Sequence, residues 1–65
     1  MKDEKWYRDK LNAYFNSRYW KYADDVEWYV DTAPNVWRFY IPWFNEIVTL
    51  TCDDDGHIRE EVENG

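Results

Sequence analysis

The first third of the chain has apolar positions three or four residues apart, the period of an amphipathic helix. The residues that fall on this face are Tyr7, Leu11, Tyr14, Phe15 and Tyr22. Asp3 can cap the amino-terminal end, and Glu4 is favourable in the first turn. The pattern therefore predicts a helix over residues 3–22.

The carboxyl-terminal end of this helix has two candidate positions. Asn16 and Ser17 favour an early end, which would leave residues 18–23 extended. Ala23, which two aspartates follow, is a later exit, and no glycine or proline lies near either position. We expect the helix to continue to about Tyr22.

From Val26 onward the period of the apolar positions changes to 2, as in strands with one buried face. Turn-forming segments separate four such runs, which cover residues 26–31, 36–41, 46–52 and 57–62. In the first run the apolar face carries Val26, Trp28 and Val30. The pattern predicts four strands with short connections.

Hairpin closure tests this assignment, because residues paired across strands must share a face. Closing the three turns places Trp28 opposite Phe39, Phe39 opposite Val48, and Cys52 opposite Ile58. The apolar face therefore stays on one side through all three turns. We predict an α+β fold, a single domain of residues 1–65, in which the helix covers one face of a four-stranded antiparallel meander and residues 63–65 form a frayed tail.

Length and cysteine content narrow the class of protein. A chain of 65 residues buries only about 60% of the surface that its unfolded form exposes. Its single cysteine excludes an internal disulfide, and one cysteine with one histidine cannot form a structural zinc site. The charged amino terminus is unlike a signal peptide, and no apolar run is long enough for a membrane span. We expect a cytoplasmic protein without a membrane partner.

Charge is distributed unevenly along the chain, whose net charge is −6. Residues 1–21 hold six basic and three acidic side chains, a balance of +3, while residues 22–65 hold two basic and eleven acidic ones, a balance of −9. The acidic part carries the predicted sheet, so the sequence favours a protein partner with a basic surface and disfavours direct nucleic-acid binding.

The sequence shows no complete catalytic or metal-binding motif. A calcium loop aligned on Gly56 lacks its first and last carboxylates, because Thr51 and Val62 stand there. Cys52 and His57 are predicted on opposite sides of the sheet, so they cannot form a nucleophile and its base. We therefore expect no enzyme activity, no cofactor and no metal.

Aromatic residues exceed what so small a core can bury. The chain has five Trp, six Tyr and three Phe, and the predicted core takes Tyr7, Tyr14, Phe15, Trp28, Trp37 and Phe39. Trp43 and Phe44 fall in a turn, and any one of the remaining aromatics could cover the end of a thin core. Taken together they favour a binding surface, since exposed Trp, Tyr and Arg are typical of interface hot spots.

Two candidate surfaces follow from the predicted fold. The outer face of the sheet and the following acidic turn carry Glu27, Tyr29, Arg38, Tyr40, Asp53, Asp54 and Asp55. The side of the helix away from the sheet carries Trp6, Lys10 and Trp20. The first is favoured because its carboxylates suit a basic partner.

Three functions are compatible with these features. The first is a small acidic protein-binding module, in one form a nucleic-acid mimic that inhibits an enzyme by occupying its basic groove, as do small inhibitors of the phage or mobile-element type. The second is a structural subunit that forms a homodimer through the first strand. The third is a single-strand nucleic-acid binder that uses Tyr29, Arg38 and Tyr40.

Overall fold

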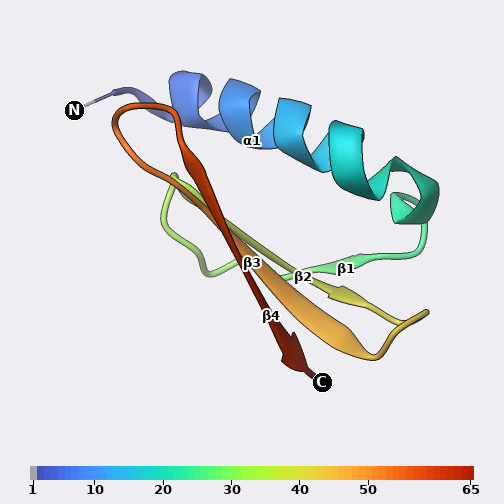
Figure 1. Cartoon of the computed structure of the whole chain (residues 1–65). Coiled ribbons are helices and arrows are strands. Elements are labelled where there is room, and N and C mark those ends of the chain that lie inside the picture. The colour runs from blue at the N-terminus through green and yellow to red at the C-terminus, as the bar shows by residue number, and fades with distance from the viewer. Residues whose placement is uncertain (1) are drawn as a thin grey trace.

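The structure, a computed structural model, describes residues 2–65 as one helix lying across one face of an antiparallel sheet (Figure 1). Its elements are α1 (Glu4–Tyr19), the 3₁₀ turn η1 (Trp20–Tyr22), β1 (Glu27–Trp28), β2 (Val36–Ile41), β3 (Glu46–Cys52) and β4 (Ile58–Asn64). The strands pair in the order β1-β2-β3-β4, and α1 contacts β3 and β4. The predicted α+β meander is therefore confirmed.

The helix begins where the sequence predicts and ends slightly earlier. Asp3 is the N-cap, and its carboxylate accepts a hydrogen bond from the Trp6 N–H at 2.8 Å. The α-helix stops at Tyr19, whose backbone departs from helical geometry with φ −123° and ψ 13°. The chain then tightens into η1, so a helical path does reach Tyr22, although its last turn is 3₁₀.

All three predicted hairpin registers are confirmed. Trp28 pairs with Phe39, Phe39 with Val48, and Cys52 with Ile58. Because side chains alternate along each strand, these pairs place the paired apolar residues of all four strands on the same face of the sheet, the face that α1 covers.

The first strand is shorter than the predicted 26–31, since ladder pairing covers only Glu27–Trp28. One more backbone bond follows, from the Tyr29 N–H to the Arg38 carbonyl at 3.0 Å. The next bond of the ladder would need the N–H of Val36, which instead donates to Ala33 at 3.0 Å and closes a tight turn. Val30 is consequently 87% exposed, and its predicted place on the buried face is wrong.

The last strand is longer than the predicted 57–62 and begins one residue later. β4 runs from Ile58 to Asn64, and the N–H of Gly65 donates to the Asn45 carbonyl at 2.8 Å. The carboxyl-terminal residues are thus hydrogen bonded to the β2–β3 turn rather than frayed. Asn45 has the positive φ of 52° that orients its carbonyl in this turn.

The core lies between α1 and the centre of the sheet. Its buried side chains are Tyr7, Leu11, Phe15, Phe39, Ile41, Val48, Leu50 and Cys52. Trp28, predicted as core, is 45% exposed, because it lies on β1, the edge strand of the sheet. Its ring contacts Phe15, Trp37 and Phe39 with centroids 5.0–5.2 Å apart, so one side of the indole is covered.

Candidate partner-binding surface

The outer face of the sheet brings together the four residues that the sequence placed there. Glu27 lies directly across from Tyr40, and Tyr29 lies across from Arg38. The Arg38 guanidinium is 5.3 Å from the centroid of the Tyr29 ring and 3.5 Å from a carboxylate oxygen of Glu63. One cation is therefore held between an aromatic ring and a carboxylate on this face.

Beside this group the outer face is hollowed by an open cavity of about 390 Å³. Its lining consists of Glu27, Trp28, Tyr29, Tyr40, Asn45, Ile47 and Gly65. The Tyr40 hydroxyl donates to the Asn45 side-chain oxygen at 2.8 Å, and the Asn45 amide donates to the Gly65 carbonyl at 3.4 Å. These bonds fix the position of the Tyr40 ring at the wall. We call this cavity the outer hollow.

The sequence analysis does not identify three residues of this surface, although strand alternation and register could have predicted two of them. Strand alternation places Ile47 on the outer face, and the β3–β4 register places Glu63 beside it. No sequence pattern predicts that Asn45 lines the cavity, because its position there depends on its hydrogen bonds with Gly65.

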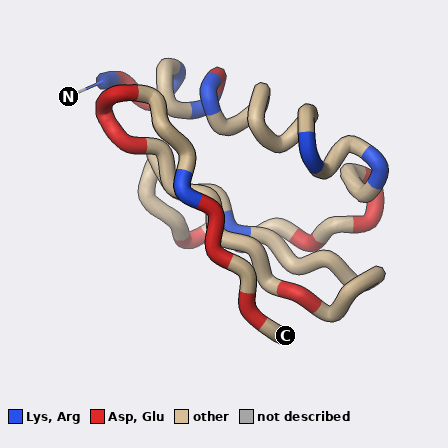
Figure 2. Tube along the Cα trace, viewed as in Figure 1, with Lys and Arg blue, Asp and Glu red and all other residues tan. Residues whose placement is uncertain are grey.

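The three aspartates predicted with this surface lie in the turn between β3 and β4. β3 has seven residues, so the turn after Cys52 is about 20 Å from the end that pairs with Tyr40. Figure 2 shows this red turn beside the amino-terminal end of α1, with further acidic residues along β4. The structure thus sets Asp53–Asp55 apart from Tyr29 and Tyr40 along β3, and their part in partner binding stays a prediction.

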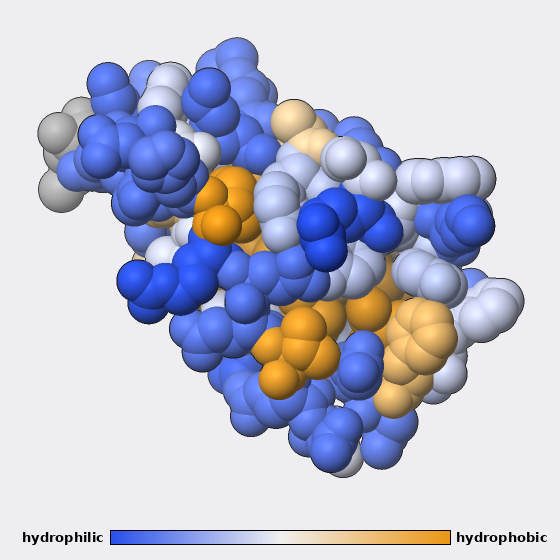
Figure 3. Space-filling model, in the orientation of Figure 1, coloured by the Kyte–Doolittle hydropathy of each residue, from blue (hydrophilic) through white to orange (hydrophobic). Residues whose placement is uncertain are grey.

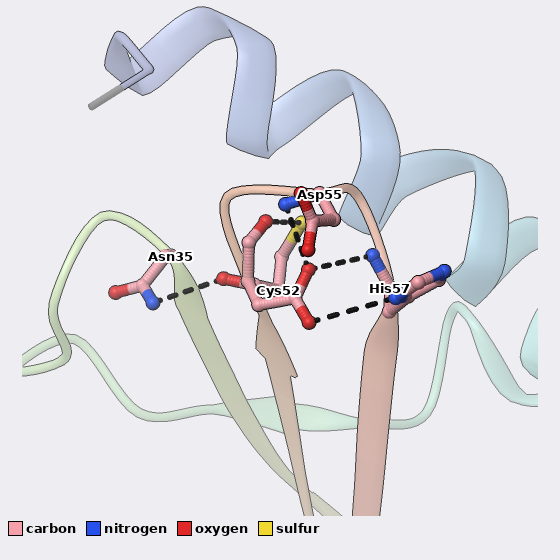
Figure 4. A network of polar contacts seen from close by, with 5 residues as sticks. Asn35, Cys52, Asp55 and His57 are labelled. Carbon is pink, nitrogen blue, oxygen red and sulfur yellow. Dashed lines mark hydrogen bonds and ion pairs between the residues drawn. The ribbon is translucent and has the colours of Figure 1, made fainter.

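Asp53 and Asp54 serve the turn itself. The Asp53 carboxylate accepts hydrogen bonds from the N–H groups of Asp55 and His57, both at 2.9 Å (Figure 4). These donors, that of His57 first, lower the pKa of the Asp53 carboxyl below its ordinary value. The carboxylate of Asp54 accepts a hydrogen bond from the hydroxyl of Tyr7 on α1.

Ligand atoms of Asp53, Asp55 and His57 lie within 4.8 Å of one another, and all three residues are exposed. The backbone hydrogen bonds of Asp53 account for this arrangement without an ion. We assign no metal to it.

Cys52 is fully buried behind the same turn. Burial raises the pKa of its thiol, so the group stays protonated at neutral pH. Its backbone carbonyl accepts from the Asn35 side chain at 3.0 Å, which ties the β1–β2 connection to the end of β3 (Figure 4). Cys52 therefore acts as a small apolar residue that packs in the core.

The second predicted surface, on the helix, is divided between two places. Trp6 is half-buried rather than on the free side of α1, and its ring packs against Tyr7 and lies over Gly56 in the β3–β4 turn. The Lys10 ammonium is 5.4 Å from this ring. Trp20 lies beyond the other end of α1 and is 63% exposed. Trp6 and Lys10 thus form one contact with the turn, and Trp20 stands apart.

The turn aromatics Trp43 and Phe44 pack against η1. Their rings lie 5.5 Å and 5.2 Å from the ring of Tyr22, and the Trp43 indole N–H donates to Asp25 at 2.8 Å. These contacts join the β2–β3 turn to the end of the helix. The exposed faces of both rings remain available at this end of the molecule.

Hydropathy on the face shown in Figure 3 is patchy, with separate orange groups bordered by hydrophilic atoms. No helix in residues 2–65 combines the length and the apolar composition that crossing a membrane requires.

Comparisons of the chain with protein-family models, curated protein sequences and solved structures gave no match. The function is therefore argued from the geometry of its own residues.

Proposed function

We propose that this chain is a small protein-binding module whose interface is the outer face of its sheet and whose partner presents a basic surface. The observation that carries the proposal is the outer hollow, where Tyr29, the residue after β1, and Tyr40 on β2 stand beside Glu27 of β1. Aromatic side chains on a rigid sheet lose little conformational entropy on binding, which suits them as anchors.

The exposure of these anchors supports the proposal. Tyr29 is 44% exposed, and Tyr40 is half-buried at the wall of the outer hollow. A partner that covered both rings would remove apolar surface from water without requiring the sheet to move.

Charge around the anchors supports a basic partner. Glu27 lies in the outer hollow, and the outer side of β4 adds Glu61 and Glu63 to Arg59. Arg38 is already paired with Glu63, so its charge is offset locally. The acidic surround would steer a basic surface toward this face and make association weaken as salt rises.

A more specific form of this proposal is an inhibitor that occupies the nucleic-acid-binding groove of a partner enzyme. Such a groove is basic because it contacts phosphates, and an acidic face with aromatic anchors would compete for it. Pairing of two copies through β1 has less support, since only Glu27 and Trp28 belong to that strand and its free edge is short.

The test of the interface begins with capture. The immobilised protein is incubated with a lysate beside two variants, the double change Tyr29→Ala/Tyr40→Ala and the control Trp20→Ala. We expect a partner that the control retains and the double variant loses. Surface plasmon resonance with that partner should show dissociation about 30-fold faster for the double variant, a loss of about 2 kcal/mol. A partner that only Trp20→Ala loses would move the interface to the helix.

A charge reversal separates steering from contact. Glu61→Lys changes an exposed carboxylate on the outer side of β4 and should mainly slow association, most strongly at low salt. An association rate that is unaffected at every salt concentration would show that the acidic surround does not recruit the partner.

We expect no direct binding of single-stranded DNA or RNA, because Arg38 is already engaged by Glu63 and the carboxylate of Glu27 lines the outer hollow. Fluorescence anisotropy with labelled oligonucleotides at low salt measures this. Micromolar binding that weakens as salt rises would favour the nucleic-acid alternative instead.

A further inference from the structure

We infer that the outer hollow receives the guanidinium group of an arginine side chain from the partner. This inference rests on the proposed function and names the chemistry that the hollow recognises. It begins from the fact that the chain already holds one guanidinium in the same way on the same face.

Arg38 shows the mode of recognition. Its guanidinium lies 5.3 Å from the centre of the Tyr29 ring and 3.5 Å from the Glu63 carboxylate. An aromatic ring and a carboxylate thus share one cation, and the planar guanidinium suits both, since it stacks on rings and donates to carboxylate oxygens.

The outer hollow offers a second ring and a second carboxylate of this kind. Tyr40 and Glu27 lie directly opposite each other across the β1–β2 ladder, and both line the hollow. Within residues 2–65, no Lys or Arg lies over the Tyr40 ring, and none forms an ion pair with Glu27. Here the ring and the carboxylate have no cation of the chain between them.

The remaining lining favours a charged head carried on an apolar stem. Ile47 and the edge of Trp28 are apolar, and methylene groups can pack against them. The side-chain oxygen of Asn45 is close to the Tyr40 hydroxyl, so it adds an acceptor beside the ring. The cavity of about 390 Å³ falls within the range of clefts that hold ligands, roughly 300–1,000 Å³.

Arginine is preferred to lysine on geometric grounds. A guanidinium can face the Tyr40 ring and still donate sideways to Glu27, because its donors lie in one plane. An ammonium is more strongly hydrated and has no plane to stack.

The test is a nuclear magnetic resonance titration of the whole protein with N-acetyl-arginine amide. The matched probe is N-acetyl-citrulline amide, which has nearly the same shape and no charge. We expect the arginine probe to shift the backbone amides of Glu27, Tyr40 and Ile47 in a saturable way that weakens with salt, and we expect the citrulline probe to leave them in place.

Two pairs of variants locate the site. Glu27→Gln should weaken the arginine probe about 2- to 5-fold, while Glu4→Gln makes the same change of charge on the exposed first turn of α1 and should leave binding unchanged. Tyr40→Phe keeps the ring and should retain binding, whereas Tyr40→Leu should lose it. Dispersed spectra of all four variants would show that they fold.

Three results would overturn the inference: equal shifts with citrulline, shifts confined to the turn at Asp53–Asp55, or no shift at any probe concentration. Each is separable from the proposed function. If a partner depends on Tyr29 and Tyr40 but the arginine probe does not bind, the proposed interface is kept and arginine recognition by the outer hollow is rejected. If the probe binds but no such partner is found, arginine recognition is kept and the proposed interface is rejected.

Discussion

Phe39→Ala is expected to lower the free energy of unfolding by about 3–5 kcal/mol, a large share of what a domain of this size has. Phe39 is fully buried at the centre of the sheet, where it pairs with Trp28 on one side and Val48 on the other. Its ring contacts those of Phe15 and Tyr19 at 5.1 Å and 5.2 Å between centroids. Removing it would leave a cavity that α1 and β2 both border.

Urea denaturation followed by circular dichroism measures this loss. Trp28→Ala is the informative comparison, because the sequence pattern places Trp28 on the same buried face but the structure leaves it 45% exposed. We expect it to cost about 1–2 kcal/mol, in proportion to its smaller buried surface. Trp20→Ala, at 63% exposure, should change stability by less than about 0.5 kcal/mol. A Trp28 variant as unstable as the Phe39 variant would contradict the edge position.

The register of the sheet could be predicted from the sequence because alternation leaves little freedom. Moving any strand by one residue would turn its whole apolar row toward solvent, so Phe39, Val48 and Leu50 fix how β2 and β3 pair. The start of the helix was equally accessible, since Asp3 is a strong N-cap residue and acts as one.

The length of β1 could not be predicted, because it depends on a competition for one hydrogen-bond donor. The N–H of Val36 either continues the ladder or closes the turn with Ala33, and both choices satisfy it equally well. The pattern at Val26, Trp28 and Val30 alternates in either case. The exposure of Trp28 and Val30 follows from that choice and from where α1 lies over the sheet.

The candidate surface was predictable in part for a related reason. Alternation correctly put Tyr29 and Tyr40 on the outer face. Net charge by segment then grouped them with the aspartates of the β3–β4 turn, but the charge of a segment carries no information on distance. Asp53 stands at the far end of β3, where it caps the turn.

Glu60 lies on β4, an edge strand of the sheet, and its side chain points under α1. It accepts hydrogen bonds from the hydroxyl of Tyr14 at 2.6 Å and from the hydroxyl of Tyr19, and Arg18 approaches it at 3.4 Å. The carboxylate side chain is 19% exposed. It therefore links β4 to the last two turns of the helix.

These contacts set the protonation of the group. Burial raises the pKa of Glu60, but the two hydroxyl donors and the Arg18 guanidinium together lower it by more than burial raises it. The pKa of Glu60 therefore lies below its ordinary value. Burial and the same hydrogen bond raise the pKa of Tyr19, which keeps that hydroxyl protonated as a donor. The stabilisation is fully present above the pKa of Glu60 in the unfolded chain, about 4.3, and is lost as the pH falls through the lower pKa of the folded state.

Glu60→Gln is therefore expected to lower the free energy of unfolding by about 2–3 kcal/mol at neutral pH, because two donors lose a charged acceptor. Arg18 contributes little to this figure, since its side chain is 57% exposed. The difference from the parent protein should shrink as the pH falls below about 4.3 and through the lower pKa of the folded-state carboxyl, where the parent's own carboxylate takes up a proton. Glu61→Gln is the matched control, because Glu61 is the next residue, faces outward and pairs with Thr49. Urea denaturation across this pH range compares the two variants. Equal stabilities at neutral pH, or a difference that stays constant as the pH falls, would show that Glu60 does not hold the helix end to β4 through its charge.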